Sequence, residues 1–373
     1  MALRWTLSKL TMNCLVLTPH RYGIRAVATA VASQWEASGH DVEYRLGDGE
    51  PAQIAGVTVG VPGIARWWYT QLRDLARGGE DYDLVWMHQP LSPSVPDASF
   101  WKRTLVTVHT TETAEYRLAR AGVYPRRRLP YLWATSRLER WFHRRLDSIN
   151  HAGPTYTVVA PHLREELDTL GVGRAAHVTN GRPEPSIDED LESAADSIRA
   201  DVGAPADATL VFALGSQTPQ KRPVVCAERL SDACAAIPDL HAVIAGDGPL
   251  HGEVRRAATH PRVHVRGHVD EREKWAWYSA ADAFLSLSVY EGLPMATLEA
   301  LASGTPVILS DISAHRHVLA AYDGCGELLS DTADLASAIR RQADRTVSPA
   351  IPSWETVAGQ YLDVHAGRDE SWT

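Results

Sequence analysis

The chain has 373 residues, of which 45% are hydrophobic, and a formal net charge of −9. This length is sufficient for two hydrophobic cores, and the mild acidity argues against nucleic acid as a partner of the whole surface. No run of about 18 apolar residues occurs, so we expect no membrane-spanning helix. The four cysteines form no CxxC pair and no regular framework, which indicates thiols in a reducing compartment.

Residues 1–20 only faintly resemble a signal peptide. Polar residues interrupt their apolar segment, and no clean cleavage site follows it. We predict that the first buried strand covers residues 13–17. Either Met1 or Met12 is the true start, and the second choice leaves residues 1–11 as a loose extension.

The N-terminal half alternates between apolar runs and amphipathic stretches. The apolar runs predict buried strands, and the amphipathic stretches predict the helices between them. This alternation is typical of a parallel sheet covered on both faces. The predicted strands are 13–17, 42–45, 57–61, 83–87, 104–108 and 155–159, and the predicted helices are 24–38, 66–77, 129–151 and 162–170.

Residues 183–201 are polar and rich in acids, which predicts a linker with one short helix. The alternation then restarts, so the sequence predicts a second α/β unit of the same style. A final helix is expected over about 354–365. The predicted strands of the second unit are 210–214, 241–244, 262–265, 283–287 and 306–309, and its predicted helices are 224–235, 273–280 and 294–302.

Residues 288–311, SVYEGLPMATLEALASGTPVILSD, form the most informative segment. Proline suits the first turn of a helix, so Pro294 predicts a helix start, with Gly304 as the C-cap. The amides of Met295, Ala296 and Thr297 are then expected to be unpaired. Such a helix end binds phosphate well.

Two glutamates flank the start of this predicted helix. Glu291 lies in the loop before it, and the side chain of Glu299 leans back toward its N-terminus. Carboxylates accept charge-assisted hydrogen bonds from paired hydroxyls. Amides for phosphate together with carboxylates for hydroxyls indicate a site for a nucleotide sugar.

The segment resembles the donor-site signature of retaining GT-B glycosyltransferases, specifically glycosyltransferase family 4 (glycosyl transferases group 1). That signature reads E-x7-E with ordered glycine and proline, and nearly every position matches. The resemblance implies an α/β fold of two Rossmann-like domains facing across a cleft. We expect an acceptor-side domain at 1–180, a donor-binding domain at 181–352, and a helix at 353–373 that crosses back to the N-terminal domain. The alternative is an ordinary helix–strand unit with two solvated glutamates.

Residues 215–222, GSQTPQKR, resemble the loop of the family in which an arginine and a lysine hold the donor diphosphate. Lys221 matches the lysine, whereas Ser216 stands in place of the arginine, and Arg222 is a candidate to supply the missing charge. Glu291 is expected to position the sugar and Glu299 the ribose. The resemblance implies donor-binding roles for Gly23, Ser216, Lys221, Arg222, Gly246, Val269, Glu291, Gly292, Leu293, Met295, Ala296 and Glu299.

A histidine of the family lies in the cleft near the donor sugar. His109 matches it at the end of a predicted strand, and His88, at the end of the preceding strand, is the rival. The resemblance implies transfer with retention by front-face displacement, in which the departing phosphate helps to deprotonate the acceptor, with no metal and no cofactor. The implied catalytic residues are His109, Lys221 and Glu291. We recognise no carboxylate candidate on the N-terminal face of the cleft.

Between Arg117 and Arg145 the sequence has nine arginines and only one acid, with aromatic residues among them. A basic amphipathic helix with tryptophan at its border suits an anionic membrane surface. Arginines also bind phosphates, such as those of a polyprenyl-phosphate-linked acceptor. We therefore expect a cytoplasmic protein, peripheral on the inner face of the cell membrane. The alternative is a solvated helix with its aromatics in the core. The candidate acceptor or membrane residues are Arg126, Arg127, Arg128, Trp133 and Arg137.

The sequence favours a transferase that acts on a glycan or lipid-linked acceptor, but it also allows other functions. A nucleotide-sugar epimerase or phosphorylase of the same fold and a non-catalytic nucleotide-sugar-binding protein remain open. A dehydrogenase is excluded, because no G-x-G-x-x-G follows the first strand. Asp81 and Asp83 resemble a metal-binding D-x-D, but they precede a buried strand, so we expect no metal site there.

Overall fold

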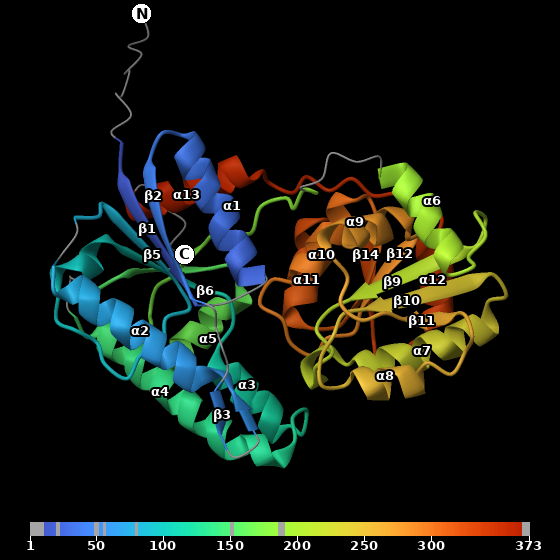
Figure 1. Cartoon of the computed structure of the whole chain (residues 1–373), viewed down its shortest axis with the longest axis horizontal. Helices are drawn as coiled ribbons and strands as arrows, with labels where there is room; N and C mark the ends of the chain where they lie inside the picture. The colour runs from blue at the N-terminus through green and yellow to red at the C-terminus, as the bar shows by residue number, and fades with distance from the viewer. Residues whose placement is uncertain are drawn as a thin grey trace, which may run out of the picture. The chain divides into compact units, whose positions relative to one another are not determined.

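The computed structural model describes residues 11–19, 23–47, 52–54, 57–78, 81–149, 153–185 and 191–367. The chain forms two compact units (Figure 1). Unit 1 comprises Met1–Arg117, Arg127–Gly181 and Ser353–Thr373, and unit 2 comprises Leu118–Arg126 and Arg182–Pro352. The segment Leu118–Arg126 thus groups with unit 2, whereas the sequence predicts an uninterrupted first domain.

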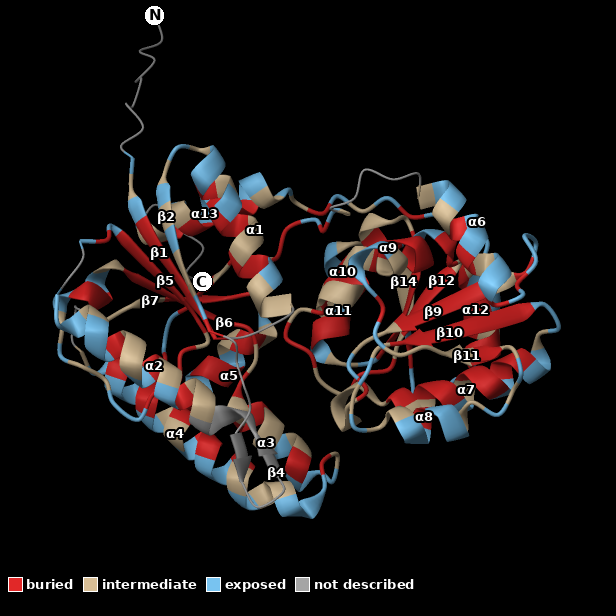
Figure 2. Cartoon of the chain, viewed as in Figure 1, coloured by how far each residue is buried: buried red, intermediate tan, exposed pale blue. Residues whose placement is uncertain are grey.

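Unit 1 is built on a parallel sheet of six strands in the order β2-β1-β5-β6-β7-β8. All residues of β5 and β6 are buried, as expected for central strands covered on both faces (Figure 2). The strands are β1 (Asn13–Thr18), β2 (Asp41–Leu46), β5 (Leu84–His88), β6 (Thr104–Val108), β7 (Thr155–Val158) and β8 (Ala176–His177).

The helices of unit 1 lie between these strands in the chain. The sequence predicts a strand over 57–61 and a helix from 66, but β4 (Val57–Val59) pairs antiparallel with β3 (Ala52–Ile54), outside the main sheet. The next helix starts at once, at Gly60. The helices are α1 (Gly23–Ala37), α2 (Gly60–Ala76), η1 (Ser99–Arg103), α3 (Glu112–Arg120), η2 (Arg126–Arg128), α4 (Leu129–Asp147) and α5 (His162–Leu170).

The last helix, α13 (Trp354–His365), packs in unit 1 against α1 (Figure 1). Its buried residues recur at helical spacing, as do those of α1, so each helix presents one apolar stripe. Trp35 of α1 donates its indole N–H to the carbonyl oxygen of Ala358 at 3.1 Å. The shared core of both helices and the sheet includes Val31, Trp35, Trp86, Val357 and Tyr361.

Unit 2 contains a second parallel six-stranded sheet, in the order β11-β10-β9-β12-β13-β14. One core lies between the sheet and α6, α9, α10 and α11, and a second lies between the sheet and α7, α8 and α12. The strands are β9 (Thr209–Leu214), β10 (Leu240–Ala245), β11 (Val263–Val265), β12 (Ala283–Ser286), β13 (Val307–Ser310) and β14 (Gly326–Leu329). The helices are α6 (Leu191–Asp201), η3 (Pro219–Lys221), α7 (Pro223–Ala236), α8 (His251–Ala257), α9 (Glu271–Ala280), α10 (Met295–Ala302), α11 (Ser313–Ala321) and α12 (Leu335–Gln342).

The predicted α/β fold with two parallel sheets is confirmed. The sequence interpretation missed α3, α8, α11 and α12, which have only seven to nine residues each. Such short helices give few repeats of the helical period, so their pattern is weak. Among the described residues, no helix combines the length and the apolar character needed to cross a bilayer.

Candidate active site

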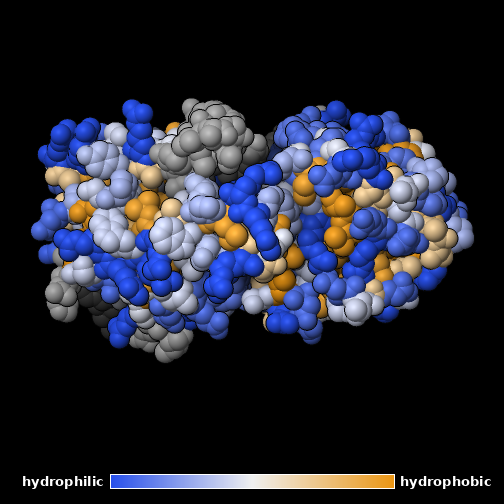
Figure 3. All heavy atoms as spheres, turned by 90° about the horizontal axis from the view of Figure 1, so that it is seen from below, coloured by the Kyte–Doolittle hydropathy of each residue, from blue (hydrophilic) through white to orange (hydrophobic). Residues whose placement is uncertain are grey.

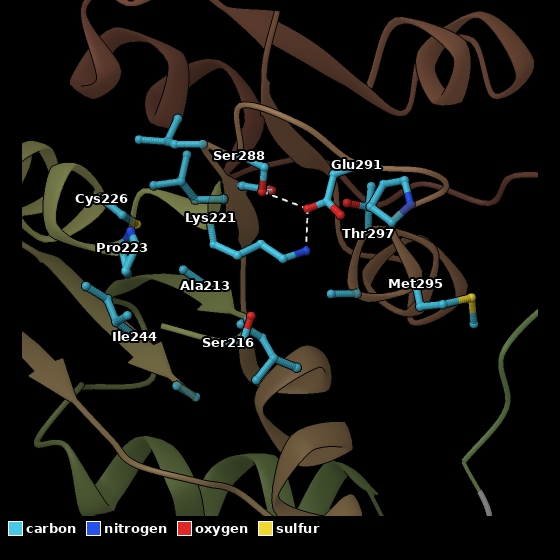
Figure 4. Close-up of a pocket in the computed structure, with 18 residues that line it drawn as sticks. Ala213, Ser216, Lys221, Pro223, Cys226, Ile244, Ser288, Glu291, Met295 and Thr297 are labelled. Carbon is cyan, nitrogen blue, oxygen red and sulfur yellow. Dashed lines mark hydrogen bonds and ion pairs between the residues drawn. The ribbon is translucent and has the colours of Figure 1, made fainter. Parts of the chain in front are cut away.

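A cavity of about 60 Å³ lies in unit 2 where β9 and β12 end (Figure 4). The loop after β9 contributes Ser216 and Lys221, the loop after β12 contributes Glu291, and the first turn of α10 contributes Met295 and Thr297. The carboxyl ends of parallel strands are the usual place for ligands in open α/β sheets. A cavity of this volume holds only a few water molecules.

Lys221 crosses this cavity to Glu291 (Figure 4). Its ammonium nitrogen lies 2.5 Å from Oε1 of Glu291, and the hydroxyl of Ser288 donates to the same oxygen at 2.7 Å. Glu291 is only 8% exposed, so its charge depends on these partners. The structure therefore brings together two of the predicted catalytic residues, and a bound phosphate has to compete with Glu291 for Lys221.

The loop after β9 is held by the glycine turn after β10. Gly246 has a φ of +119°, and a Cβ atom there would lie 2.0 Å from the carbonyl oxygen of Gly215. The amide of Gln217 donates to the carbonyl of Asp247 at 2.8 Å. Only glycine fits at position 246, because a Cβ atom there would meet the backbone of Gly215.

Helix α10 differs from its prediction at its start. Pro294 is the N-cap residue in an extended conformation, and the helix begins at Met295. The amide of Thr297, predicted to be unpaired, donates to the carbonyl oxygen of Pro294 at 3.1 Å. Its hydroxyl is fully buried, has no hydrogen-bond partner among the described residues, and belongs to a residue that lines the cavity. The hydroxyl is thus an additional candidate donor to a phosphate.

Glu299 does not line the cavity. Helix α9 holds its carboxylate, since Lys274 contacts Oε1 at 2.9 Å and the Tyr278 hydroxyl donates to Oε2 at 2.9 Å. The sequence interpretation did not consider either partner. The i, i+4 spacing of Lys274 and Tyr278 indicates that they share one face of a helix. No sequence pattern near them indicates that this face contacts Glu299.

Other predicted donor residues lie outside the cavity lining. Arg222, at a φ of +51°, pairs with Asp331 at 2.6 Å, so the structure does not bring it to Lys221's partner Glu291. Val269 is buried in the core, where only its backbone is available for a ligand. Ser216 lines the cavity and is exposed, whereas Gly292 and Leu293 do not line it.

In unit 1, the two candidate histidines form one pair. His109 follows β6, His88 ends β5, and His88 Nδ1 lies 2.9 Å from His109 Nε2. His88 is fully buried and His109 is 6% exposed. The two histidines that the sequence offered as alternatives for the cleft position therefore contact each other. Gly23, predicted for the donor site, is the first residue of α1 in the same unit.

The start of α3, three residues after His109, gathers carboxylates that the sequence interpretation overlooked. Glu139 accepts hydrogen bonds from the amides of Glu112 and Thr113 at 2.8 and 2.9 Å, and Glu166 accepts one from Thr111 at 2.6 Å. Burial raises the pKa of Glu139 to about 7, and burial together with Glu115 and Glu139 raises that of Glu112 to about 8. These side chains come from α3, α4 and α5, so no local pattern could reveal the cluster.

The arginine-rich region covers the end of α3, η2 and most of α4. Trp133 and Trp141 are 49% and 46% exposed, whereas Phe142 is buried, so the aromatics are divided between solvent and core. The guanidinium of Arg137 lies 5.7 Å from the ring centre of Trp133. Seen from the side on which α2 and α4 lie, hydrophilic residues predominate among scattered hydrophobic ones (Figure 3). The helix thus exposes tryptophan together with arginine.

Residues 208–345 match the family model described as "Glycosyl transferases group 1", and this range contains the cavity. A GDP-mannose-dependent alpha-(1-6)-phosphatidylinositol dimannoside mannosyltransferase of Mycobacterium tuberculosis is 30% identical over 162 residues, 43% of this chain and 42% of that protein. A phosphatidyl-myo-inositol mannosyltransferase of the same species is 32% identical over 161 residues, 42% of this chain and 40% of that protein. The matched region spans less than half the length of these relatives.

Among solved structures, a sucrose-phosphate synthase from Thermosynechococcus elongatus matches with a TM-score of 0.66 at 17% identity, over 96% of this chain and 99% of that chain. At this identity the likeness concerns the fold alone. The two α/β units with parallel six-stranded sheets have the fold of GT-B glycosyltransferases, as the resemblance of the donor motif implied. The region that matches the group 1 model, residues 208–345, lies within unit 2.

Proposed function

We propose that the protein is a retaining glycosyltransferase of family 4, which moves a sugar from a nucleotide-diphosphate donor to a glycan or lipid-linked acceptor. The observation that carries the proposal is the Lys221–Glu291 pair, placed at the N-terminus of α10 within the group 1 match. A cation and a helix N-terminus stabilise the charge of a departing diphosphate. Glu291 positions the sugar and Glu299 the ribose.

The proposed reaction is a front-face displacement. The bond between the anomeric carbon and the diphosphate oxygen breaks, and the acceptor hydroxyl oxygen bonds to the same face of that carbon. The hydroxyl proton passes to the departing phosphate, so neither metal nor cofactor takes part. Lys221 stabilises the leaving group, and His109 of unit 1 is assigned to the donor sugar.

Two related proteins are a GDP-mannose-dependent mannosyltransferase and a phosphatidyl-myo-inositol mannosyltransferase, which makes GDP-mannose the first donor to test and phosphatidylinositol the first acceptor lipid. The test measures thermal stabilisation by GDP-mannose, UDP-glucose and ADP-glucose, followed by transfer to acceptor in the presence of EDTA. We expect one donor to stabilise the fold and to yield product with retained anomeric configuration by NMR. Glu291→Gln should abolish transfer, with the exposed Glu355→Gln as control. An inverted product excludes the retaining mechanism.

The two remaining alternatives give different products. An epimerase converts the nucleotide sugar without an acceptor, and a phosphorylase needs inorganic phosphate in the reverse direction. A non-catalytic binding protein is stabilised by the nucleotide sugar but converts it to no product. Chromatography of the nucleotide sugar, with and without acceptor, therefore separates these functions from a transferase.

We also propose that the surface of η2 and α4 binds an anionic membrane or the phosphate of a lipid-linked acceptor, on the cytoplasmic face. Exposed Trp133 and Trp141 beside arginines fit a charged interface. Flotation with phosphatidylinositol vesicles tests it: Arg126→Ala/Arg127→Ala should weaken binding, while Arg255→Ala/Arg256→Ala on α8 serves as the charge-matched control. Equal binding by both variants rejects the assigned surface.

A further inference from the structure

Helix α9 presents Lys274 and Tyr278 to Glu299, and Glu271 lies beside Lys274. Glu271, Lys274 and Tyr278 follow one another at spacings of three and four residues, which places them on one face of the helix. The carboxylate of Asp270 caps the helix by accepting from the amide of Glu273 at 2.8 Å. The start of α9, and with it the position of Lys274, is therefore fixed by a cap.

Lys274 is bound on both sides by carboxylates. Its ammonium nitrogen lies 2.9 Å from Oε1 of Glu299 and 2.8 Å from Oε1 of Glu271. The indole N–H of Trp275 donates to that same oxygen of Glu271 at 2.8 Å, which holds the second carboxylate in place. Burial disfavours the charge of Lys274, but Glu299 and Glu271 together raise its pKa, so the side chain remains an ammonium.

Tyr278 fixes the other oxygen of Glu299. Its hydroxyl donates to Oε2 at 2.9 Å, and the tyrosine is fully buried. Burial, followed by the neighbouring charge of Glu299, raises the pKa of Tyr278 well above its usual value, so the hydroxyl keeps its proton and remains a donor. Each oxygen of Glu299 thus has one donor. A carboxylate has about four acceptor sites, which leaves about one on each oxygen.

We propose that Lys274 and Tyr278 are positioning residues that hold Glu299 so that its two oxygens accept the two neighbouring hydroxyls of a ribose. The site then selects nucleotides that carry both hydroxyls and rejects 2′-deoxy nucleotides. The two carboxylates and one ammonium leave a net negative charge, which strengthens hydrogen bonds from hydroxyls. This inference rests on the proposed function, in which Glu299 binds the ribose.

The experiment measures the dissociation constants of GDP and 2′-deoxy-GDP by calorimetry. A hydrogen bond from a hydroxyl to a carboxylate corresponds to roughly 10- to 100-fold in affinity, so wild type should prefer GDP by about that factor. Lys274→Met should reduce the ratio of the two constants to about threefold or less, and Tyr278→Phe should lower it partly. Lys274→Arg, which keeps the cation, should retain most of the preference. Lys102→Met, at an exposed lysine of unit 1, is the control.

The ratio within each variant does not depend on how much protein is folded. If Lys274→Met keeps the wild-type ratio, the positioning role is wrong while the proposed function stands. If wild type binds GDP and 2′-deoxy-GDP equally, the ribose assignment of Glu299 is wrong. If wild type binds no nucleoside diphosphate, including UDP and ADP, the proposed function fails together with this inference.

Discussion

The Nδ1 atom of His88 lies 2.9 Å from the Nε2 atom of His109, and the two rings stack with their centres 5.2 Å apart. One of these nitrogens must donate and the other accept, so the pair shares one proton at this contact. Trp86 packs on His88 with ring centres 4.1 Å apart. The contact with His88 thus orients the ring of His109 and couples the tautomers of the two histidines.

His88→Phe is expected to lower kcat of transfer by about 10- to 100-fold, by analogy with partners that orient metal-ligating histidines, because it removes the partner of the histidine that we propose contacts the donor sugar. The KM for the donor should change little, since His88 is fully buried behind His109. Steady-state kinetics on purified variants measure both constants. The exposed His268→Ala in unit 2 is the control, and an unchanged kcat in His88→Phe contradicts the positioning role.

Gly246→Ala is expected to disrupt the donor loop. The alanine would adopt a φ of +119°, and its Cβ would lie 2.0 Å from the carbonyl oxygen of Gly215. We expect a loss of stability of about 1–3 kcal/mol and loss of nucleotide binding. Thermal unfolding and calorimetry measure these effects. Gly252→Ala is the matched control, since a Cβ there meets nothing within 4 Å, and it should stabilise α8 slightly.

Lys221→Ala is expected to abolish donor binding and to destabilise unit 2. It leaves the buried carboxylate of Glu291 with the hydroxyl of Ser288, at a cost of about 1–3 kcal/mol. The double variant Lys221→Ala/Glu291→Ala should recover part of this stability without recovering activity. Urea denaturation and transfer assays separate the two effects. A double variant that is less stable than Lys221→Ala contradicts this account.

The carboxylates at the start of α3 should make stability fall as the pH rises. The folded-state pKa values of Glu139 and Glu112 are raised to about 7 and about 8, from a usual value of 4.5. At pH values between the usual pKa and the raised folded-state pKa, the carboxyl group is ionised in the unfolded chain but protonated in the folded chain. The free energy of unfolding therefore decreases as the pH rises. It should drop from about pH 5 to pH 8, and Glu112→Gln should reduce the drop.

Urea denaturation at several pH values measures this dependence as the difference between Glu112→Gln and wild type. That difference removes the contribution of all other titrating groups. The exposed Glu355→Gln on α13 is the control. Parallel curves for wild type and Glu112→Gln would falsify the assignment of the pH dependence to this cluster.

The sequence predicted features that depend on neighbouring residues. Pro294 predicted the start of α10 to within one residue, and the resemblance to the family's diphosphate loop singled out Lys221, which lines the same cavity as Glu291. It could not show that Lys221 and Glu291 pair with each other, because 70 residues separate them. The role of Pro294 was predicted only approximately, since local pattern does not distinguish an N-cap from a first helical residue.

The features that the sequence did not predict depend on contacts between elements far apart in the chain. Glu299 of α10 contacts Lys274 of α9. Glu139 of α4 accepts hydrogen bonds from the first amides of α3, although 26 or 27 residues separate them in the sequence. Arg222, a candidate to supply charge to the diphosphate, has an αL backbone and pairs with Asp331, 109 residues further along the chain. Tertiary packing determines these hydrogen-bond and ion-pair partners, and the local pattern of a single sequence does not reveal it.

The packing of α13 against α1 affects the order in which the chain can fold during synthesis. The core of unit 1 needs Val357 and Tyr361, and the Trp35–Ala358 bond joins residues 323 positions apart. Unit 2 is nearly continuous in sequence, from Arg182 to Pro352, and all of it precedes α13. The ribosome therefore delivers all of unit 2 before unit 1 can close its core, so the unit whose synthesis begins first completes its core last.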